Sequence, residues 1–194
     1  MRTLFTKKAA TCEPVDLNDA VQEVIALSLR ELQRNRVIVR TEFAADLPAV
    51  MGDRVQLQQV VLNLFLNASD AMSGLDDRPR MLTIRTKSDP EGRARVTVQD
   101  TGVGFDPQHA ERLFDAFYTT KSGGMGIGLS VSRSIVQNHQ GRLWAVANDG
   151  PGVTFSFSIP HRDDGDVGSD GVPSVRSYAA ADGDRTMRNP AGSR

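Results

Sequence analysis

Apolar residues recur at helical spacing in three stretches of the chain, which predict helices at about 16–34, 53–72 and 127–139. Asp16 or Asn18 can cap the first of these helices. The third leads to Gly141, and glycine is favoured just beyond a helix C-terminus. At 194 residues the chain is long enough for one domain with a substantial core.

Strict alternation of apolar and polar residues predicts five strands, at 36–43, 81–87, 93–99, 142–147 and 153–159. The last two flank an NDGPG turn and read as a hairpin. Strands with one apolar face, combined with helices, predict an α/β (α+β) two-layer sandwich. We expect a mixed, mainly antiparallel sheet with the three helices on one face. Asp106-Pro107 predicts one further short helix, at 107–116.

Polar residues of the second predicted helix fall on one narrow stripe, because they are spaced three or four residues apart. Its members are Gln56, Gln59, Asn63, Asn67 and Asp70. Most other residues of this helix are apolar, so we expect it to be buried around most of its circumference. The stripe then needs hydrogen-bond partners, from another polar element or from a ligand. Asp53 and Gln56 form a capping box at its start.

Two glycine clusters flank a short polar segment that carries Lys121. Asp100 ends a predicted strand beside Gly102 and Gly104, where a carboxylate could accept a hydrogen bond from the amino group of adenine. A simple tight turn is the alternative. The second cluster, at 123–128, opens the third helix and could cradle phosphate or act as a hinge. It matches neither the P-loop nor the dinucleotide fingerprint.

Asn63 and Asn67 lie one helical turn apart on the same face. Side-chain amide oxygens can ligate Mg²⁺ together with waters and phosphate oxygens. A satisfied network of amide hydrogen bonds is the alternative interpretation of the pair.

Composition narrows the possible partners. A net charge of −1 gives no global attraction to nucleic acid or to an anionic membrane. The single Cys12 excludes a disulfide framework, and there is no apolar run of membrane-spanning length. These features predict a cytoplasmic protein. Residues 162–194 are rich in Gly, Asp, Ser and Arg without apolar periodicity, which predicts a disordered tail.

Four segments, in order, resemble the conserved boxes of bacterial sensor histidine kinases. QQVVLNLFLNASDAM resembles the N box, DTGVGFD the first glycine box, LFDAFYTTK the F box and GGMGIGLS the second glycine box. The resemblance extends over residues 13–161. It implies the C-terminal catalytic domain of such a kinase, with an ATP-binding fold shared with gyrase, mismatch-repair ATPases and one class of heat-shock chaperones.

The resemblance also implies roles for single residues. Asp100 would bind the adenine amino group beside Gly102 and Gly104. Phe114 and Phe117 would anchor a lid over the nucleotide.

Asn67 would hold Mg²⁺ and Asn63 would lie next to the phosphates; with Lys121 they would form the catalytic set. The ATP-binding residues implied in this way are Asn63, Asn67, Asp70, Asp100, Gly102, Gly104, Phe114, Phe117, Tyr118, Thr119, Lys121, Gly124, Met125, Gly126, Ile127, Gly128 and Leu129.

Asn63 also bears on the type of reaction. Hydrolysing members of this superfamily resemble one another in having a glutamate one turn before the metal-binding asparagine. An amide cannot act as a base near neutral pH. Asn63 therefore favours phosphoryl transfer to another acceptor over steady hydrolysis of ATP.

Such kinases carry their phosphorylated histidine on a helical hairpin. His109, His139 and His161 do not stand in the family's acceptor context, and each is interpreted as a surface histidine. Residues 1–12 resemble the linker that follows the hairpin. The chain is therefore predicted to be a monomeric catalytic half that phosphorylates a hairpin on another chain, with a response regulator as an indirect partner.

Two alternatives belong to the same superfamily. One is a serine kinase that binds a partner, as anti-sigma regulators do, and the other is a non-catalytic ATP-binding interaction domain. The boxes around Asn63 and Gly126 fit the sensor-kinase pattern better. A hydrolysing ATPase is disfavoured by Asn63.

Overall fold

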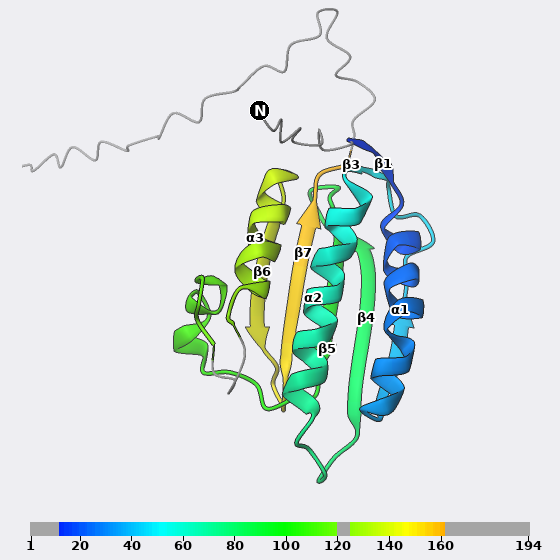
Figure 1. Cartoon of the computed structure of the whole chain (residues 1–194). Helices are drawn as coiled ribbons and strands as arrows, with labels where there is room; N and C mark the ends of the chain where they lie inside the picture. Colours follow the sequence, from blue (N-terminus) through cyan, green and yellow to red (C-terminus); the bar gives the residue numbers. More distant parts are fainter. Residues whose placement is uncertain (1–11, 120–124, 162–194) are drawn as a thin grey trace, which may run out of the picture. The chain divides into compact units, whose positions relative to one another are not determined.

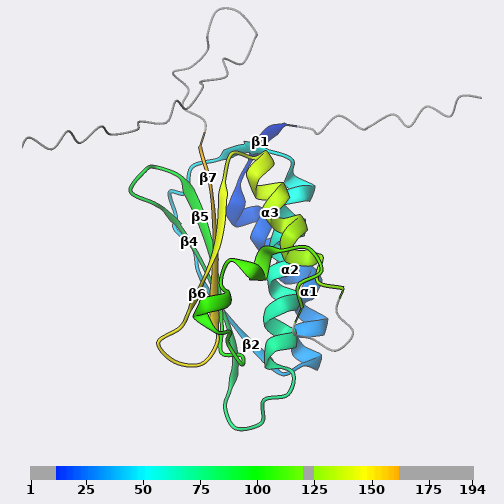
Figure 2. The same cartoon turned by 90° about the vertical axis from the view of Figure 1, so that its left-hand side faces the viewer.

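The computed structural model describes residues 12–119 and 125–161. Most of the predicted linker at 1–12 and the whole predicted tail at 162–194 lie outside these residues. The described part forms two layers, with helices α1 (Leu17–Arg34), α2 (Arg54–Met72) and α3 (Gly128–Asn138) covering one face of a sheet (Figures 1 and 2). The predicted sandwich is confirmed.

The main sheet has the strand order β2-β4-β5-β7-β6. Its strands are β2 (Val37–Glu42), β4 (Arg80–Ser88), β5 (Ala94–Asp100), β7 (Val153–Ile159) and β6 (Arg142–Ala147). β2 pairs with β4 in parallel, and the other neighbours are antiparallel, as predicted. β1 (Glu13–Val15) and β3 (Val50–Gly52) form a second, two-stranded sheet that was not predicted. Three-residue strands are too short to show a period of two.

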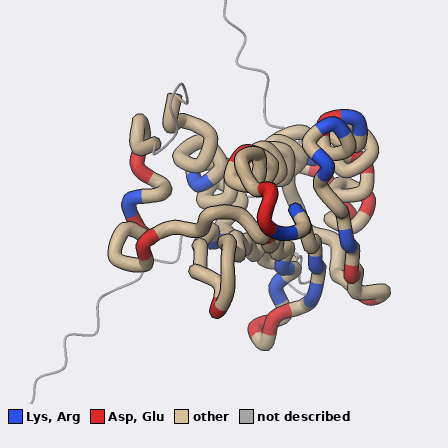
Figure 3. The backbone as a smooth tube through the Cα atoms, turned by 90° about the horizontal axis from the view of Figure 1, so that it is seen from below, with Lys and Arg blue, Asp and Glu red and all other residues tan. Residues whose placement is uncertain are grey.

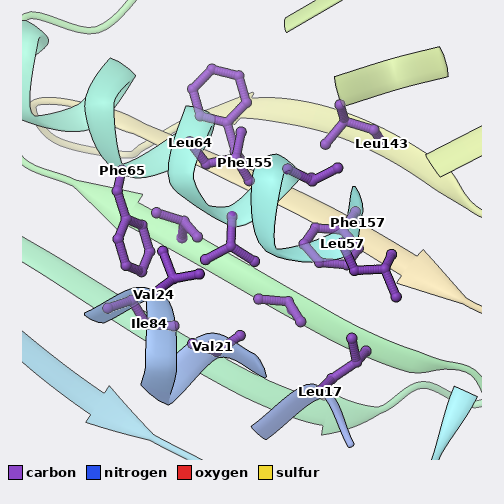
Figure 4. Packing of buried hydrophobic residues seen from close by; sticks show 14 of the residues in the cluster. Leu17, Val21, Val24, Leu57, Leu64, Phe65, Ile84, Leu143, Phe155 and Phe157 are labelled. Carbon is purple, nitrogen blue, oxygen red and sulfur yellow. The ribbon is translucent and has the colours of Figure 1, made fainter. Parts of the chain in front are cut away.

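The core lies between the helices and the inward side chains of the sheet (Figure 4). Leu17, Val21 and Val24 of α1 lie with Ile84 of β4 on one side of this layer, and Leu57 of α2 packs toward Phe157 of β7. Burying one such Leu or Phe side chain stabilises a fold by about 1.5–3 kcal/mol. This layer holds the sheet and helices in a fixed arrangement.

The helix ends follow the predicted chemistry with one change. The carboxylate of Asp16 accepts the backbone N–H groups of Asn18 and Asp19, at 2.7 and 3.1 Å, and so caps α1. Beyond α3, Gln140 rather than Gly141 takes the left-handed conformation, with φ of 57°. Gly141 is needed for a different reason, because a Cβ there would lie 2.6 Å from Cδ1 of Ile159.

The predicted helix at 107–116 is wrong in form. The structure has two short 3₁₀ helices, η1 (Pro107–His109) and η2 (Arg112–Phe114). Asp106 still caps the first, accepting the N–H of Gln108 at 2.9 Å. The chain leaves the helical path where the ring of Phe114 enters the core, so tertiary packing overrides the local pattern.

The prediction that α2 is buried around most of its circumference is also wrong. α2 lies between α1 and α3 (Figure 1). Three of its apolar residues, Val55, Leu62 and Leu66, are exposed. Gln59 and Asp70 of the polar stripe are exposed as well. An apolar count along the helix cannot reveal that one side faces outward.

Charges are dispersed over the described backbone. Lys and Arg alternate with Asp and Glu in the view of Figure 3, in keeping with the net charge of −1. Among the described residues, no helix has the length and apolar character needed to cross a bilayer.

His139 is a structural residue rather than a surface histidine. Its Nε2 accepts the backbone N–H of Asp53 at 3.0 Å, and its Nδ1 lies 2.8 Å from the carbonyl oxygen of Ile135. This assigns the proton to Nδ1. In the capping box of α2, Asp53 accepts the N–H of Gln56, but the Gln56 side chain bonds the Asp53 carboxylate. His139 therefore takes the backbone N–H that a capping-box glutamine usually binds.

Replacing His139 by alanine should lower the free energy of unfolding by about 1–3 kcal/mol, because the N–H of Asp53 loses its acceptor. Urea denaturation followed by circular dichroism measures this change. Gln137→Ala, at an exposed position of the same helix, is the control. Equal stability of the two variants would show that the bond between His139 and Asp53 contributes nothing.

Candidate nucleotide-binding site

A cavity of about 620 Å³ opens between the C-terminal half of α2, the loop after β5, the start of α3 and the inner face of β7. Pockets for small molecules commonly measure about 300–1,000 Å³. The cavity is lined by Asn67, Asp70, Ala71, Gly74, Asp100, Val103, Gly104, Phe105, Asp106, His109, Leu113, Tyr118, Thr119, Met125, Gly126, Ile127, Gly128, Leu129, Val153 and Phe155.

Asp100 is the last residue of β5 and is only 1% exposed. Its Oδ1 accepts the backbone N–H of Gly102 at 2.8 Å and that of Val153 at 3.3 Å. The two donors lie on the following loop and at the start of β7. The carboxylate therefore fixes two segments that are distant in sequence, and it has a defined orientation in the cavity wall.

Glycines make this wall possible. A Cβ on Gly102 would lie 2.7 Å from Cβ of Ala71, where the loop passes against α2. A Cβ on Gly152 would collide with the backbone carbonyl of Asp100. The N–H of Val103 also donates to the carbonyl of Ala71, at 3.2 Å. A larger residue at Gly102 would push the loop after β5 away from α2, and one at Gly152 would push the β6–β7 turn away from Asp100.

α2 and the start of α3 also contribute to the lining. Asn67 is half-buried and lines the cavity, whereas Asn63, one turn earlier, is not among the lining residues. The Asn63 amide instead donates to the carbonyl of Gly128 at 3.2 Å and to Oγ of Ser132 at 3.1 Å. Asn63 therefore does not line the cavity itself but bonds to Gly128, the first residue of α3, which does.

The described lining carries three carboxylates, Asp70, Asp100 and Asp106, and no Lys or Arg. A triphosphate in this cavity would need positive charge. The free N–H groups at the start of α3 supply part of it. The side-chain oxygen of Asn67 suits Mg²⁺, which binds few protein oxygens and keeps waters and phosphate oxygens as its other ligands. No group of three His, Cys, Asp or Glu suited to a metal is present in the described chain.

The segment of the predicted F box has one buried phenylalanine and one exposed one. Phe114 packs edge-on against Phe155 with ring centroids 6.4 Å apart, and the guanidinium of Arg133 lies 5.6 Å from its ring. Phe117 is 77% exposed, so its ring does not anchor the segment as the resemblance implied. Its backbone does so instead, because its N–H donates to the carbonyl of Gly126 at 2.9 Å.

The cavity brings together most of the described residues that were predicted to bind ATP. Those that line it are Asn67, Asp70, Asp100, Gly104, Tyr118, Thr119, Met125, Gly126, Ile127, Gly128 and Leu129. Those that do not are Asn63, Gly102, Phe114 and Phe117. Lys121 and Gly124 lie outside the described residues.

Several residues that line the cavity were not predicted from the sequence. They are Ala71, Gly74, Val103, Phe105, Asp106, His109, Leu113, Val153 and Phe155. Val103 and Phe105 stand within the DTGVGFD segment, which could have indicated them. No sequence signal indicates Val153 and Phe155, because they reach the cavity only through the pairing of β7 with β5.

Comparison with known proteins identifies the family. Residues 52–163 match the sequence profile described as "Histidine kinase-, DNA gyrase B-, and HSP90-like ATPase". The chain belongs to this ATPase family. It is 40% identical over 148 residues to the sensor protein FixL of Bradyrhizobium diazoefficiens, covering 76% of this chain and 29% of FixL. It is 35% identical to the sensor histidine kinase TmoS of Ectopseudomonas mendocina, covering 82% of this chain and 16% of TmoS.

Solved structures give the same family. The nucleotide-free catalytic domain of the histidine kinase ThkA superimposes with a TM-score of 0.67 at 29% identity, over 77% of this chain and 95% of that one. Full-length ShkA in complex with AMPPNP gives 0.68 at 25% identity, over 77% and 31%. The chain thus spans less than a third of FixL, TmoS and ShkA, and its likeness covers their ATPase domain.

Gly126 should be intolerant of a side chain. Its φ is +64°, and a Cβ would lie 2.7 Å from both the carbonyl carbon of Phe117 and the carbonyl oxygen of Tyr118. The left-handed conformation alone costs an alanine about 1–2 kcal/mol. Gly126→Ala should therefore lower stability by at least that amount in thermal denaturation.

Gly150→Ala, with nothing within 4 Å of its Cβ, is the matched control and should stay near wild type. Equal melting temperatures for the two variants would contradict the close packing between Phe117 and Gly126.

Proposed function

We propose that this chain is the ATP-binding catalytic domain of a sensor histidine kinase, and that it transfers the γ-phosphoryl group of ATP to a histidine on a separate helical hairpin. The observation that carries the proposal is the buried carboxylate of Asp100, which lines the same cavity as the N-terminus of α3. A fixed hydrogen-bond acceptor suits the base of ATP, and a helix N-terminus suits its phosphates.

The adenine end of the nucleotide is assigned to Asp100. Two backbone N–H groups hold its Oδ1, so the carboxylate meets a base with little reorganisation. Apolar side chains such as Phe105, Leu113 and Val153 line the cavity as well and suit the faces of a purine. A buried acceptor favours adenine, which has an exocyclic amino group, over guanine, which has a carbonyl oxygen at that position.

The phosphate end is assigned to the start of α3 and to Asn67. Gly126 and Gly128 line the cavity where α3 begins, and the helix dipole of α3 favours the charge of phosphate oxygens. Mg²⁺, held by the side-chain oxygen of Asn67, would neutralise phosphate charge when bound.

The contacts of the described histidines are in keeping with transfer to an acceptor on another chain. Both ring nitrogens of His139 are occupied by backbone groups, and His161 pairs through its backbone with Val50 at the sheet end. His109 lines the cavity with its Nδ1 3.7 Å from Oδ2 of Asp106. Asn63 has committed its amide N–H groups to α3, and an amide is not a general base. The amide at position 63 therefore favours phosphoryl transfer over hydrolysis.

The partners are proposed from relatives. ThkA was solved in complex with the response regulator TrrA, and this chain superimposes on ThkA there with a TM-score of 0.68. By analogy, a response regulator would act downstream of the phosphorylated hairpin. We further expect the domain to act in the cytoplasm, and to be monomeric when separated from the hairpin.

Asp100→Asn should weaken ATP binding about 10- to 100-fold, since a hydrogen bond to a charged acceptor contributes about 1.5–3 kcal/mol. The asparagine keeps the shape of the side chain but replaces one acceptor by a donor. Isothermal titration calorimetry with ATP and Mg²⁺ measures the change. Asp149→Asn, an exposed turn residue, is the control. A wild-type protein that releases no heat with ATP or ADP would refute ATP binding itself.

γ-³²P-labelled ATP should transfer its label to the acceptor hairpin of a sensor histidine kinase supplied on another chain, and the label should be acid-labile, as phosphohistidine is. The isolated domain should stay unlabelled. Asn67→Ala should reduce transfer by more than about tenfold, because it removes the protein ligand of Mg²⁺. Acid-stable label on a supplied protein would indicate the serine-kinase alternative. ATP binding without transfer to any hairpin would favour a non-catalytic interaction domain.

A further inference from the structure

A closed hydrogen-bond network joins α2 to the first turn of α3. The Nδ2 atom of Asn63 donates to the carbonyl of Gly128 and to Oγ of Ser132, and the Ser132 hydroxyl donates to the same carbonyl at 2.9 Å. Ser132 is fully buried, at 0% exposure. Each of the three donor hydrogens therefore has an acceptor within the network.

This network orients the amide of Asn63. Both of its N–H groups are turned toward α3, so Nδ2 is not free to donate to a phosphate. Gly128, the residue that receives the two bonds, lines the cavity and begins α3. Any influence of Asn63 on the cavity through these bonds therefore passes through the position of Gly128.

Asn67 lies one turn along α2 from Asn63 and lines the cavity from the α2 side. Fixing Asn63 to Gly128 thus fixes the separation of Asn67 from the N-terminus of α3. We propose that Ser132, acting with Asn63, is a positioning residue that sets this separation and thereby the phosphate end of the site. This inference rests on the proposed function, because it assigns phosphates to this end.

The neighbouring serines of α3 show what a purely local role looks like. Ser130 donates its hydroxyl to Ile127 at 2.8 Å, and Ser134 donates to Ser130 at 3.1 Å, each within or at the end of its own helix. A serine bonded back to its helix contributes little to stability and needs no partner elsewhere. Of these three, Ser132 has the described bond to α2, so α3 contains its own control positions.

Ser132→Ala removes the hydroxyl and leaves Asn63 with one acceptor on α3. Since a net hydrogen bond contributes about 1 kcal/mol, the dissociation constant for Mg·ATP should rise about three- to tenfold. Ser134→Ala should change it less than about twofold. Adenosine, which lacks phosphates, should bind Ser132→Ala and wild type equally, because its contacts are at the Asp100 end. General loosening of the fold would weaken both ligands together.

A double-mutant cycle tests whether Ser132 acts through Asn63. In the Asn63→Ala background, Ser132→Ala should have no further effect on Mg·ATP binding, because the network is already broken. Calorimetry of wild type, both single variants and the double variant gives the coupling. If Ser132→Ala does not fold, Ser132→Cys, with similar volume and a weak donor, takes its place in the cycle.

The outcomes are distinguishable. If wild type binds neither Mg·ATP nor adenosine, the proposed function fails and this inference fails with it. If wild type binds both ligands but Ser132→Ala matches Ser134→Ala, the inference alone is overturned. It is also overturned if Ser132→Ala weakens adenosine as much as ATP, or if its effect persists undiminished without Asn63. A loss confined to Mg·ATP and abolished by Asn63→Ala supports it.

Discussion

The buried carboxylate of Asp100 is the constraint on which the site depends. Its Oδ1 binds the N–H groups of Gly102 and Val153, so one side chain ties the end of β5, the loop after it and the start of β7. The backbone carbonyl of Asp100 lies so close to Gly152 that no side chain fits there, and it accepts a hydrogen bond from Nδ2 of Asn148 at 2.9 Å. These two contacts hold the β6–β7 turn against the end of β5. A charge left at 1% exposure is costly unless it is hydrogen-bonded, and these bonds make the position tenable.

The second constraint is the attachment of α3 to α2 at both of its ends. Asn63 holds the first residue of α3, and His139, its C-cap, accepts the backbone N–H at the N-cap of α2. The two helices therefore run antiparallel with their separation set at two points about ten residues apart along α3. Rigid placement of α3 matters because the first residues of this helix line the same cavity as Asp100.

Sequence reasoning succeeded where the determinants are local. Strand alternation placed β4, β5, β6 and β7 within a residue or two. Asp53 and Asp106 were recognised as caps, and Asp16 was one of two candidates, because a cap contacts its own first turn. It failed where contacts with a segment distant in sequence determine the local structure. The two 3₁₀ turns replace a helix because Phe114 packs on Phe155, and His139 becomes structural because α3 ends beside Asp53. The site followed the same division: Asp100 and Gly128 were found from motifs, whereas Ser132, Val153 and Phe155 depend on tertiary pairing.

The central claim is that the Asp100 carboxylate recognises the exocyclic amino group of adenine, and the most direct measurement compares ATP with inosine triphosphate. The two nucleotides differ at that group, which is a carbonyl oxygen in inosine, so a carboxylate would face an acceptor instead of a donor. Calorimetric titration should show inosine triphosphate binding about 100-fold or more weakly than ATP, since buried polar sites reject ligands that leave them unpaired. Equal affinity for the two nucleotides would contradict the assignment of Asp100 and, with it, the orientation of ATP in the cavity.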